Sequence, residues 1–549
     1  MSFEQYTGSE YWDFPTLHRW CLALCEEHKE WMQYEELSLS REGRPIFLIR
    51  IGKNVGSTPN FWLDAGTHAS EWTGVMSAVY SLSEWAKELS DPKACTWFEK
   101  NSITVVPCVS PDGFQALHEG EPFIRSSRRP PLEGTERVGL DPQDIDGNRK
   151  VLLMRWKHPA GPYVMDESAS LGVRKRTLQD DPALACFVSQ EGLFVEWDGC
   201  EWKHAPLKNG IDLNRNFPVH WSPFSMFGMD AGAYSLSEPE SRAITDALYR
   251  FKNTAAVLSN HTYTGALLSQ PYHPDSPLPK GDINLIQELA EQAVNGTDYR
   301  VIKVYPDFVY DKSQRIIGVW ADFVSSNFGI PAYTLELWDP FRWAGQTMDK
   351  PAEFFDHPDQ DVIQALLKKA AEEHFYPWTP YDHPQLGKVE IGGFNYFETI
   401  RNPPRALLAE ECRKGHRIAE NLRKSLPNVL ATYRMTSLDE NTYRLDVMLE
   451  NIGFLGTSAT NRAANLGLAA RPKLTLTHGT SHSQRTQYLP ILAGWGSDLY
   501  KQNLVYPGLS AHSCRAKASW IIQGDTATVE WDAGRGGRGT LHITATNPD

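Results

Sequence analysis

Residues 60–109 read NFWLDAGTHASEWTGVMSAVYSLSEWAKELSDPKACTWFEKNSITVVPCV. A short apolar run at 60–66 is followed by apolar residues at helical spacing over 71–89 and by a second apolar run from 102. Short apolar runs are typical of buried strands, and the 3.6-residue period is typical of an amphipathic helix. Because alternating strands and helices form sheets covered by helices, this segment predicts an α/β fold with a parallel or mixed sheet.

The same alternation continues on both sides of this segment. Upstream, the pattern predicts a helix over 14–31 and a hairpin over 34–52 with its turn at 41–45. Residues 111–113, Pro-Asp-Gly, predict a turn at the end of the strand that starts at 102. Downstream, strands are expected at 255–261, 299–306 and 332–338, and helices at 238–252, 282–295 and 358–374.

Changes of amino-acid composition and pattern at three places along the chain predict the domain organisation. The long stretch between 114 and 212 is irregular and rich in Pro, Gly and charge; within it, 144–156 predicts two strands around an Asp-Gly turn. A Pro-rich boundary follows at 376–387, and then a helix at 406–425. From 431 onward short alternating strands predict an all-β sandwich. We therefore expect an α/β domain over 1–400 with an insertion at about 119–208, a linker helix over 401–428 and a β-sandwich accessory domain over 429–549.

Composition excludes several classes of protein. The 549 residues carry 54 Lys and Arg against 68 Asp and Glu, a net charge of −14, which disfavours binding to nucleic acid. Charged residues make up 22% and the apolar types 41%, as in ordinary globular chains. No apolar run is long enough to span a membrane, and the start MSFEQYTGSEYWDF lacks the pattern of a secretory signal. We expect a cytoplasmic protein without membrane contact, whose eight scattered cysteines are reduced.

A histidine and a glutamate lie three residues apart where the first strand gives way to the helix: His68 and Glu71. Open α/β sheets place their ligands beyond the carboxyl ends of strands. Two His and one Glu form an established zinc set, in which a catalytic zinc keeps one open position. His261, which closes the strand 255–261, is the candidate third ligand. The pair alone also fits a buried His beside an exposed Glu in the first helical turn.

Two other polar features lie near strands. Asn214 and Arg215, within DLNRNFP, place a planar bidentate donor beside a neutral amide, which suits recognition of a carboxylate but also occurs on surface loops. Glu336 lies between Leu335 and Leu337, so its side chain points away from theirs. It faces either solvent or a pocket, and a pocket would raise its pKa towards that of a general base.

The order of these motifs resembles the zinc metallocarboxypeptidases of the M14 (carboxypeptidase A-like) family, of the bacterial type with an extended insertion and a C-terminal β domain. H-x-x-E is followed by an Arg-rich loop, D-x-N-R-N, H-T-Y and E-L-x-D. The resemblance covers about residues 5–375 and includes the hairpin S-x-E-G-R-P-I. It implies a mixed twisted sheet with helices on both faces, and cis peptide bonds at Thr262-Tyr263 and Trp338-Asp339.

The resemblance also implies a metal site. His68, Glu71 and His261 match the ligands of one zinc ion per chain. Asp212 matches the carboxylate that orients the first of these histidines.

Further roles concern the substrate and the reaction. Asn214 and Arg215 match the pair that holds the C-terminal carboxylate of the substrate. The segment I-R-S-S-R resembles the family's W-R-x-x-R and places Arg125 at the scissile carbonyl oxygen. Glu336 matches the residue that serves first as general base and then as general acid.

The match is incomplete at three places. Ser70 stands where many members carry an Arg between the zinc ligands. Tyr310 is the candidate for the mobile Tyr that closes over the substrate, although it lies farther from Asp322 than is usual. In GVWADF, which resembles G-x-x-x-D-W, the residue that sets side-chain preference falls on Ala321, and Asp322 either selects basic side chains or is structural.

The insertion resembles an extended rim that narrows the entrance and favours short peptides. Within it, Asp144, Asp146 and Asn148 form the D-x-D-G-N pattern of a calcium loop. The pattern lacks the downstream bidentate Glu of a complete EF-hand, and Asp-Gly also makes a hairpin turn without any ion. Calcium is therefore the less favoured interpretation here.

The resemblance implies a zinc-dependent carboxypeptidase that hydrolyses the C-terminal bond of peptides with a free carboxylate. One alternative is a zinc amidase or peptidase acting on cell-wall peptide, γ-glutamyl or acyl-amino acid bonds. Another is a non-catalytic binding module on the same fold, against which the complete set of ligands and base argues. The C-terminal sandwich contains no chemical motif, and we expect it to serve packing or oligomer contacts. The short leading segment predicts no inhibitory pro-domain in this chain.

Overall fold

The computed structural model describes residues 4–132, 136–309, 315–348, 354, 357–481, 483–509 and 512–545. Its main body contains an eight-stranded mixed sheet in the order β1-β2-β4-β3-β13-β16-β14-β15. The strands are β1 (Met32–Leu39), β2 (Pro45–Ile51), β3 (Asn60–Ala65), β4 (Ser102–Val106), β13 (Thr254–Thr262), β14 (Ala266–Ser269), β15 (Arg300–Lys303) and β16 (Ala332–Leu337). The predicted α/β fold with a mixed sheet is confirmed.

The four central strands run parallel. β13 lies between β3 and β16, and β4 flanks β3 on its other side. Every residue of β3, β4 and β13 is buried, as expected for parallel strands with both faces covered. The register pairs His261 with Glu336, and Asn260 with Ala65. The polar residues at the carboxyl ends of these strands therefore share one edge of the sheet.

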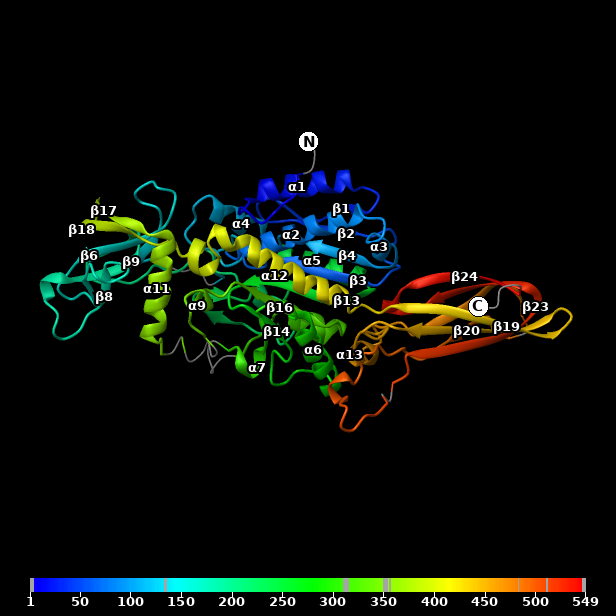
Figure 1. The fold of residues 1–549 in the computed structure, drawn as a ribbon. Coiled ribbons are helices and arrows are strands. Elements are labelled where there is room, and N and C mark those ends of the chain that lie inside the picture. Colours follow the sequence, from blue (N-terminus) through cyan, green and yellow to red (C-terminus); the bar gives the residue numbers. More distant parts are fainter. Residues whose placement is uncertain are drawn as a thin grey trace.

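Helices cover both faces of the sheet (Figure 1). Alternate residues of β3 enter opposite cores, since Phe61 and Leu63 pack on one face and Trp62 on the other. The helices of the first face are α1 (Phe14–Glu27), α2 (Trp72–Leu89), α6 (Lys280–Ala293) and α12 (Arg405–Arg423). Those of the second face are α5 (Pro239–Arg250) and α8 (Trp320–Phe323).

Two segments differ from their sequence expectations within this body. The Pro-Asp-Gly expected as a turn is the first turn of α4 (Pro111–His118), where the ring of Pro111 is compatible with position N1 of a helix. The helix expected as a linker, α12, is packed into the main core: its Leu408, Cys412 and Ile418 are fully buried. The helix expected at 358–374 is α11 (Gln360–His374).

The insertion builds a sheet of its own. Its order is β17-β18-β6-β9-β7-β8, with the separate pair β10-β5 beside it. The strands are β5 (Gly139–Pro142), β6 (Leu153–Lys157), β7 (Tyr163–Met165), β8 (Val173–Lys175), β9 (Ala185–Gln190), β10 (Gly192–Val195), β17 (Tyr376–His383) and β18 (Gly387–Gly393). Two expectations are corrected. The Pro-rich boundary at 376–387 is a hairpin that pairs with β6, and 144–156 contains one strand instead of two.

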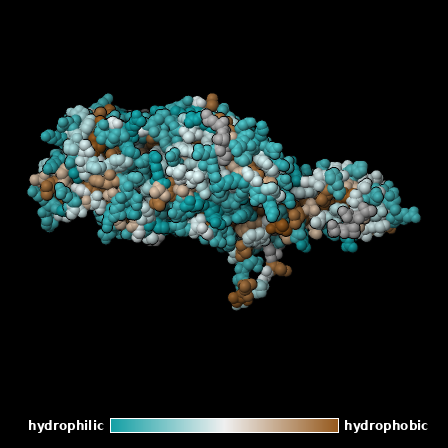
Figure 2. Space-filling view, turned by 45° about the horizontal axis from the view of Figure 1, so that its top comes forward, coloured by the Kyte–Doolittle hydropathy of each residue, from teal (hydrophilic) through white to brown (hydrophobic). Residues whose placement is uncertain are grey.

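The C-terminal region is a separate antiparallel sheet, which confirms the all-β prediction. Its strands are β19 (Val429–Asp439), β20 (Thr442–Asn451), β21 (Lys473–Ser481), β22 (Thr486–Tyr488), β23 (Arg515–Asp532) and β24 (Arg538–Thr544). The 18-residue β23 pairs with β20, β21 and β24, and a core of their apolar residues lies between them. Figures 1 and 2 show this region as a narrow lobe that extends from the main body.

One buried arginine joins this lobe to the body. Arg535 lies in the turn between β23 and β24, and its guanidinium donates to the backbone carbonyl oxygens of Phe328, Gly329 and Ser458 at 2.7–2.8 Å. Burial lowers its pKa to about 9. Nearby, Asp282 of α6 accepts the backbone N–H groups of Asn461 and Arg462. The contact is therefore polar and specific on both sides.

None of the helices in the described ranges combines the length and the apolar character that crossing a bilayer requires.

We predict that Arg535→Met destabilises the protein by about 3 kcal/mol, because three buried carbonyl groups lose their donors. Urea denaturation followed by tryptophan fluorescence measures the change. The control is Arg538→Met, whose exposed side chain pairs with Asp532 and whose loss should cost less than about 1 kcal/mol. Equal losses of stability in the two variants would contradict the role assigned to Arg535.

Candidate active site

The site lies at the carboxyl ends of β3 and β13. After β3, the chain turns at Gly66, whose φ is +71° and whose missing Cβ would lie 3.0 Å from Val75 and 3.2 Å from Cys108. This tight turn brings His68 and Glu71 back over the strand end just before α2 begins. Because β13 runs parallel to β3, its penultimate residue His261 reaches the same point.

The three candidate metal ligands converge in the structure. His68 Nδ1 lies 3.0 Å from Glu71 Oε1 and 3.0 Å from His261 Nδ1. His261 Nδ1 lies 2.9 Å from Glu71 Oε2. All three side chains are buried. The sequence prediction that these residues meet at one point is thus supported by the geometry.

This donor set fits zinc. Two imidazole nitrogens and one carboxylate are typical zinc ligands, and bonds of about 2.0 Å in a tetrahedron place the donor atoms about 3.3 Å apart. The distances of 2.9–3.0 Å between the donor atoms are close to that value. Three protein ligands leave the fourth position open, which is the arrangement of a catalytic rather than a structural site.

Both histidines are oriented through their other ring nitrogen. His68 Nε2 lies 3.2 Å from Asp212 Oδ1, and His261 Nε2 lies 3.2 Å from Ser259 Oγ. Ser259 in turn donates to the buried carboxylate of Asp64. With Nε2–H as donor, the Nδ1 lone pair of each ring is available to a metal. Asp212 therefore occupies the orienting position that was predicted for it.

Two arginines balance the carboxylates of the site. Arg125 donates from Nη1 to Glu71 at 3.2 Å and from Nε to Asp212 at 3.3 Å. Arg401 places Nη1 3.6 Å from Glu71. Burial alone would raise the pKa of Asp212, but the charges of Arg125 and His68 outweigh it and hold this pKa well below its usual value.

The two glutamates of the site are driven in opposite directions. Burial would raise the pKa of Glu71, yet the neighbouring His68 and His261 hold it well below the usual value. Burial, and then the charge of Glu71, raise the pKa of Glu336 to about 7, against the opposing charges of His261 and Arg125. Glu71 is thus kept ionised, as a metal ligand must be. The pKa of Glu336 instead lies where its carboxyl group can accept or release a proton near neutral pH.

A cavity of about 340 Å³ opens over these groups. Charged residues form its floor, and apolar residues form one wall. The floor contains Glu71, Arg125, Asp212, Arg215, Glu336 and Arg401, and the apolar wall contains Phe123, Leu207, Phe224, Met226, Phe227 and Met229. The guanidinium of Arg215 lies 5.6 Å from the centre of the Phe224 ring. The cavity therefore offers positive groups beside apolar surface.

Not every predicted residue lines this cavity. Asn214 is buried, its amide oxygen accepts the N–H of Trp320 at 2.9 Å, and its contact with a substrate stays a prediction. Tyr310 lies outside the described residues. The carboxylate of Asp322 accepts from Gln270 and Ser326, which matches the structural interpretation of this residue.

The structure also tests the two cis peptide bonds that the resemblance implied. Thr262-Tyr263 is a cis peptide bond, as the resemblance implied. Trp338-Asp339 is not among the cis bonds of the described chain, so that expectation is wrong; instead Trp338 has a φ of +68°.

Sequence reasoning missed Arg401. Its position follows from Asn402, whose side chain donates to Ser70 O at 3.0 Å and accepts from Thr73 N at 3.0 Å. These bonds hold the segment against the start of α2. The guanidinium also lies 5.2 Å from the ring centre of Tyr263. No local pattern marks Arg401, because Glu71 and Tyr263 both lie more than 130 positions earlier in the sequence.

Comparison with known proteins gives two family matches. The family model described as zinc carboxypeptidase matches residues 17–168 and 193–365. A domain of unknown function matches residues 429–544. Among curated relatives, carboxypeptidase A1 of Bos taurus is 26% identical over 349 residues, covering 62% of this chain and 63% of the relative. Carboxypeptidase B of Astacus astacus is 25% identical over 120 residues, covering 22% and 39%. The chain thus spans less than two thirds of the length of these relatives.

Solved structures with a similar fold include carboxypeptidase A of Helicoverpa armigera, with 17% identity and a TM-score of 0.41, covering 66% of this chain and 73% of that one. The murein-tripeptide amidase of Escherichia coli O157 has 15% identity and a TM-score of 0.28, covering 61% and 91%.

We predict that the purified protein retains one zinc ion per chain and that His261→Gln loses it. Because changes to residues that merely orient a ligand cost about 10- to 100-fold in metal affinity, loss of a ligand should leave less than about a tenth of the zinc after dialysis. Inductively coupled plasma mass spectrometry measures the content. His204→Gln, at an exposed position in the insertion, is the matched control and should keep its zinc. Equal zinc content in both variants would refute the assignment.

Proposed function

The chain belongs to the zinc carboxypeptidase family, and we propose that it removes the C-terminal residue from peptides as a zinc-dependent metallocarboxypeptidase. The observation that carries the proposal is the shared cavity. Glu71 of the triad, the carboxyl group of Glu336 and the guanidinium of Arg215 all line the same cavity. His68 and His261 lie directly behind Glu71, with ring nitrogens 3.0 and 2.9 Å from its carboxylate oxygens. A non-catalytic module would have no need for a second carboxyl group, that of Glu336, in the cavity beside Glu71 of the triad.

Zinc held by the triad supplies Lewis acidity, which polarises a carbonyl group and acidifies a bound water. The residues of the chain then have separate tasks. Glu336 accepts the proton of the attacking water and later delivers a proton to the leaving amine. Its raised pKa suits both steps, since a general base works best when its pKa lies near the working pH.

Arginines provide the remaining charge stabilisation. Arg125 is tied to Glu71 and Asp212 and so is held rigidly beside the metal ligands, where its positive charge would stabilise the oxygen that gains charge during attack. Arg215 lies on the charged floor next to Phe224 of the apolar wall, where it would bind the free carboxylate of the substrate in bidentate fashion. The phenyl and thioether groups around it favour an apolar side chain on the residue that is released.

We predict that Glu336→Gln lowers kcat by at least about 100-fold and leaves the zinc content unchanged, because the amide keeps the shape but cannot accept the proton. Steady-state kinetics on an N-blocked dipeptide measures the effect. The matched control is Glu240→Gln in α5, another buried carboxyl group with a pKa raised by burial to about 7, which lies away from the cavity and should leave kcat unchanged.

The pH profile belongs to the same test. Because Glu336 must be ionised to accept a proton, activity should rise with pH through the pKa of this group. The value of about 7 applies without the metal, and the nearby dication lowers it, so the acidic limb of kcat/KM should lie at or below about pH 7. A rate that falls as the pH rises through this range would overturn the assigned role.

We predict that Arg215→Met raises KM by about 10- to 100-fold for a peptide with a free C-terminal carboxylate, which is the cost of losing a charge-assisted hydrogen-bonded partner. The same peptide ending in a carboxamide is the control and should be affected little. Equal losses on both peptides would argue against an exopeptidase. In that case, a parallel assay with muropeptides and γ-glutamyl or acyl-amino acid amides would test the amidase alternative.

A further inference from the structure

Three carboxylates converge in the insertion, outside the proposed active site. Asp144 and Asp146 lie in the loop between β5 and β6, and Glu191 is the single residue between β9 and β10. One carboxylate oxygen from each lies within 4.8 Å of the others. The sequence pattern D-x-D-G-N therefore gains a third acidic group, from a position 45 residues beyond Asp146.

Glu191 is the informative member of this cluster. Its side chain is fully buried, and neither carboxylate oxygen makes a hydrogen bond of acceptable geometry. The backbone fixes it in place, since Glu191 N donates to Leu152 O at 3.0 Å and Gln143 N donates to Glu191 O at 3.1 Å. A buried carboxylate without a partner is destabilising unless a positive charge accompanies it.

The described residues supply no such charge at the cluster. Among the described residues, no Lys, Arg or His forms an ion pair with Asp144, Asp146 or Glu191, and Lys150, which lies nearby in sequence, turns to Glu398 at 3.3 Å. Burial, and then the charges of Asp146 and Asp144, raise the pKa of Glu191 to about 8, although the N–H groups of Leu152 and Ile145 oppose the rise. The three carboxyl groups of the cluster thus disfavour one another's ionisation, and a bound cation would offset this effect.

The loop is already shaped around these oxygens. Asp144 accepts the backbone N–H groups of Gly147 and Arg149, each at 2.8 Å, and Asp146 accepts that of Asn148 at 3.0 Å. Asn148 stabilises the loop itself, since its amide oxygen accepts the N–H of Lys150 at 2.8 Å and its amide nitrogen donates to Asp146 at 3.0 Å. Asp146 is exposed, so that solvent can reach one side of the cluster while Glu191 closes the other.

We infer that Asp144, Asp146 and Glu191 form a binding site for Ca²⁺. The donors are all oxygens, which favours a hard cation over zinc. Calcium accepts six to eight oxygen ligands in irregular arrangements and takes both oxygens of a glutamate, whereas magnesium requires near-ideal octahedral geometry. Three carboxylates give the site enough negative charge to hold a dication, and water can complete the coordination at the exposed side.

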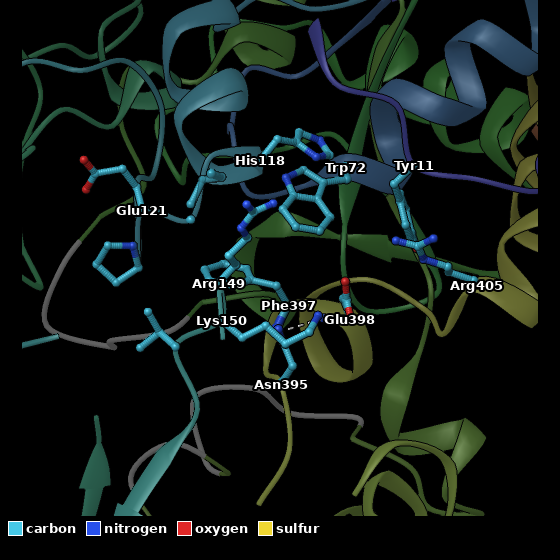
Figure 3. A pocket seen from close by; sticks show the side chains of 14 residues that line it. Tyr11, Trp72, His118, Glu121, Arg149, Lys150, Asn395, Phe397, Glu398 and Arg405 are labelled. Carbon is cyan, nitrogen blue, oxygen red and sulfur yellow. Dashed lines mark hydrogen bonds and ion pairs between the residues drawn. The ribbon is translucent and has the colours of Figure 1, made fainter. Parts of the chain in front are cut away.

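Calcium bound at this site would also stabilise a loop that forms part of the wall of a second cavity. The loop residues that follow the cluster, Arg149 and Lys150, line a cavity of about 210 Å³ together with Trp72, His118 and Glu398 (Figure 3). Trp72 directly follows the candidate zinc ligand Glu71. Calcium would therefore fix the rim segment that faces the start of α2.

Calcium titration of the zinc-loaded full chain tests this inference. The protein is stripped of metals, reloaded with zinc alone and titrated with CaCl₂, with heat of binding and Tm as readouts. We expect one calcium per chain and a rise in Tm of about 3 °C or more at a calcium concentration about 100 times Kd. MgCl₂ at the same concentration should produce a smaller shift.

Amino-acid substitutions distinguish calcium binding at this site from general effects of CaCl₂ on stability. Glu191→Gln and Asp146→Asn should lose the calcium response. Glu167→Gln removes one exposed acidic group from the same insertion and should respond as the wild type does. A wild-type Tm that ignores calcium, an undiminished response in Glu191→Gln, or an equal response to magnesium would overturn the assignment.

Discussion

Four ionisable side chains are buried together at one edge of the central sheet, and the surrounding structure is arranged to offset the cost of that burial. His68, Glu71, His261 and Glu336 lie within reach of one another because β3, β13 and β16 are parallel neighbours in a fixed register. Isolated buried charges are strongly unfavourable, so each needs a partner. Asp212 and Ser259 hold the imidazoles, while Arg125 and Arg401 face Glu71. A dication at the triad would complete this balance and would also keep Glu71 ionised.

The register explains why two carboxyl groups of the same type behave differently. Glu71 meets both imidazoles and the backbone N–H of Thr262, whereas Glu336 lies one strand farther along and meets mainly the negative charge of Glu71. A shift of β16 by one residue would turn Glu336 to the opposite face of the sheet. The chemistry proposed for the site therefore depends on strand pairing, although no hydrogen bond of the sheet takes part in it.

Local sequence patterns predicted the helices and strands that are formed by contiguous stretches of the chain. The strand, helix and strand of residues 60–109 were found at β3, α2 and β4, and the ligand order followed from a family resemblance. Contacts between distant segments could not be predicted in this way. Residues 376–387 have the proline content of a boundary, yet they form most of a hairpin whose second strand, β18, pairs with β6 more than 200 positions earlier. Likewise, the sequence pattern D-x-D-G-N contains only two carboxylates. The third comes from Glu191, which the turn between β9 and β10 brings next to this loop in the folded chain. The Pro-Asp-Gly at 111–113 shows the converse error, since a proline at N1 begins a helix as readily as a turn.

Arg401 shows how a missing charge is restored by tertiary structure. Ser70 stands where the family resemblance led us to expect an arginine, and Arg401 places its guanidinium 3.6 Å from the adjacent Glu71. Arg401 lies beyond the residues matched by the family model, in the segment that leads into α12. Asn402 ties this segment to Ser70 and Thr73, and α12 packs along α2 in the main core. The segment after the family-matched region is therefore part of the candidate site. A truncation made at the end of the sequence match would remove one of the positive groups that compensate Glu71, together with the helix that holds it.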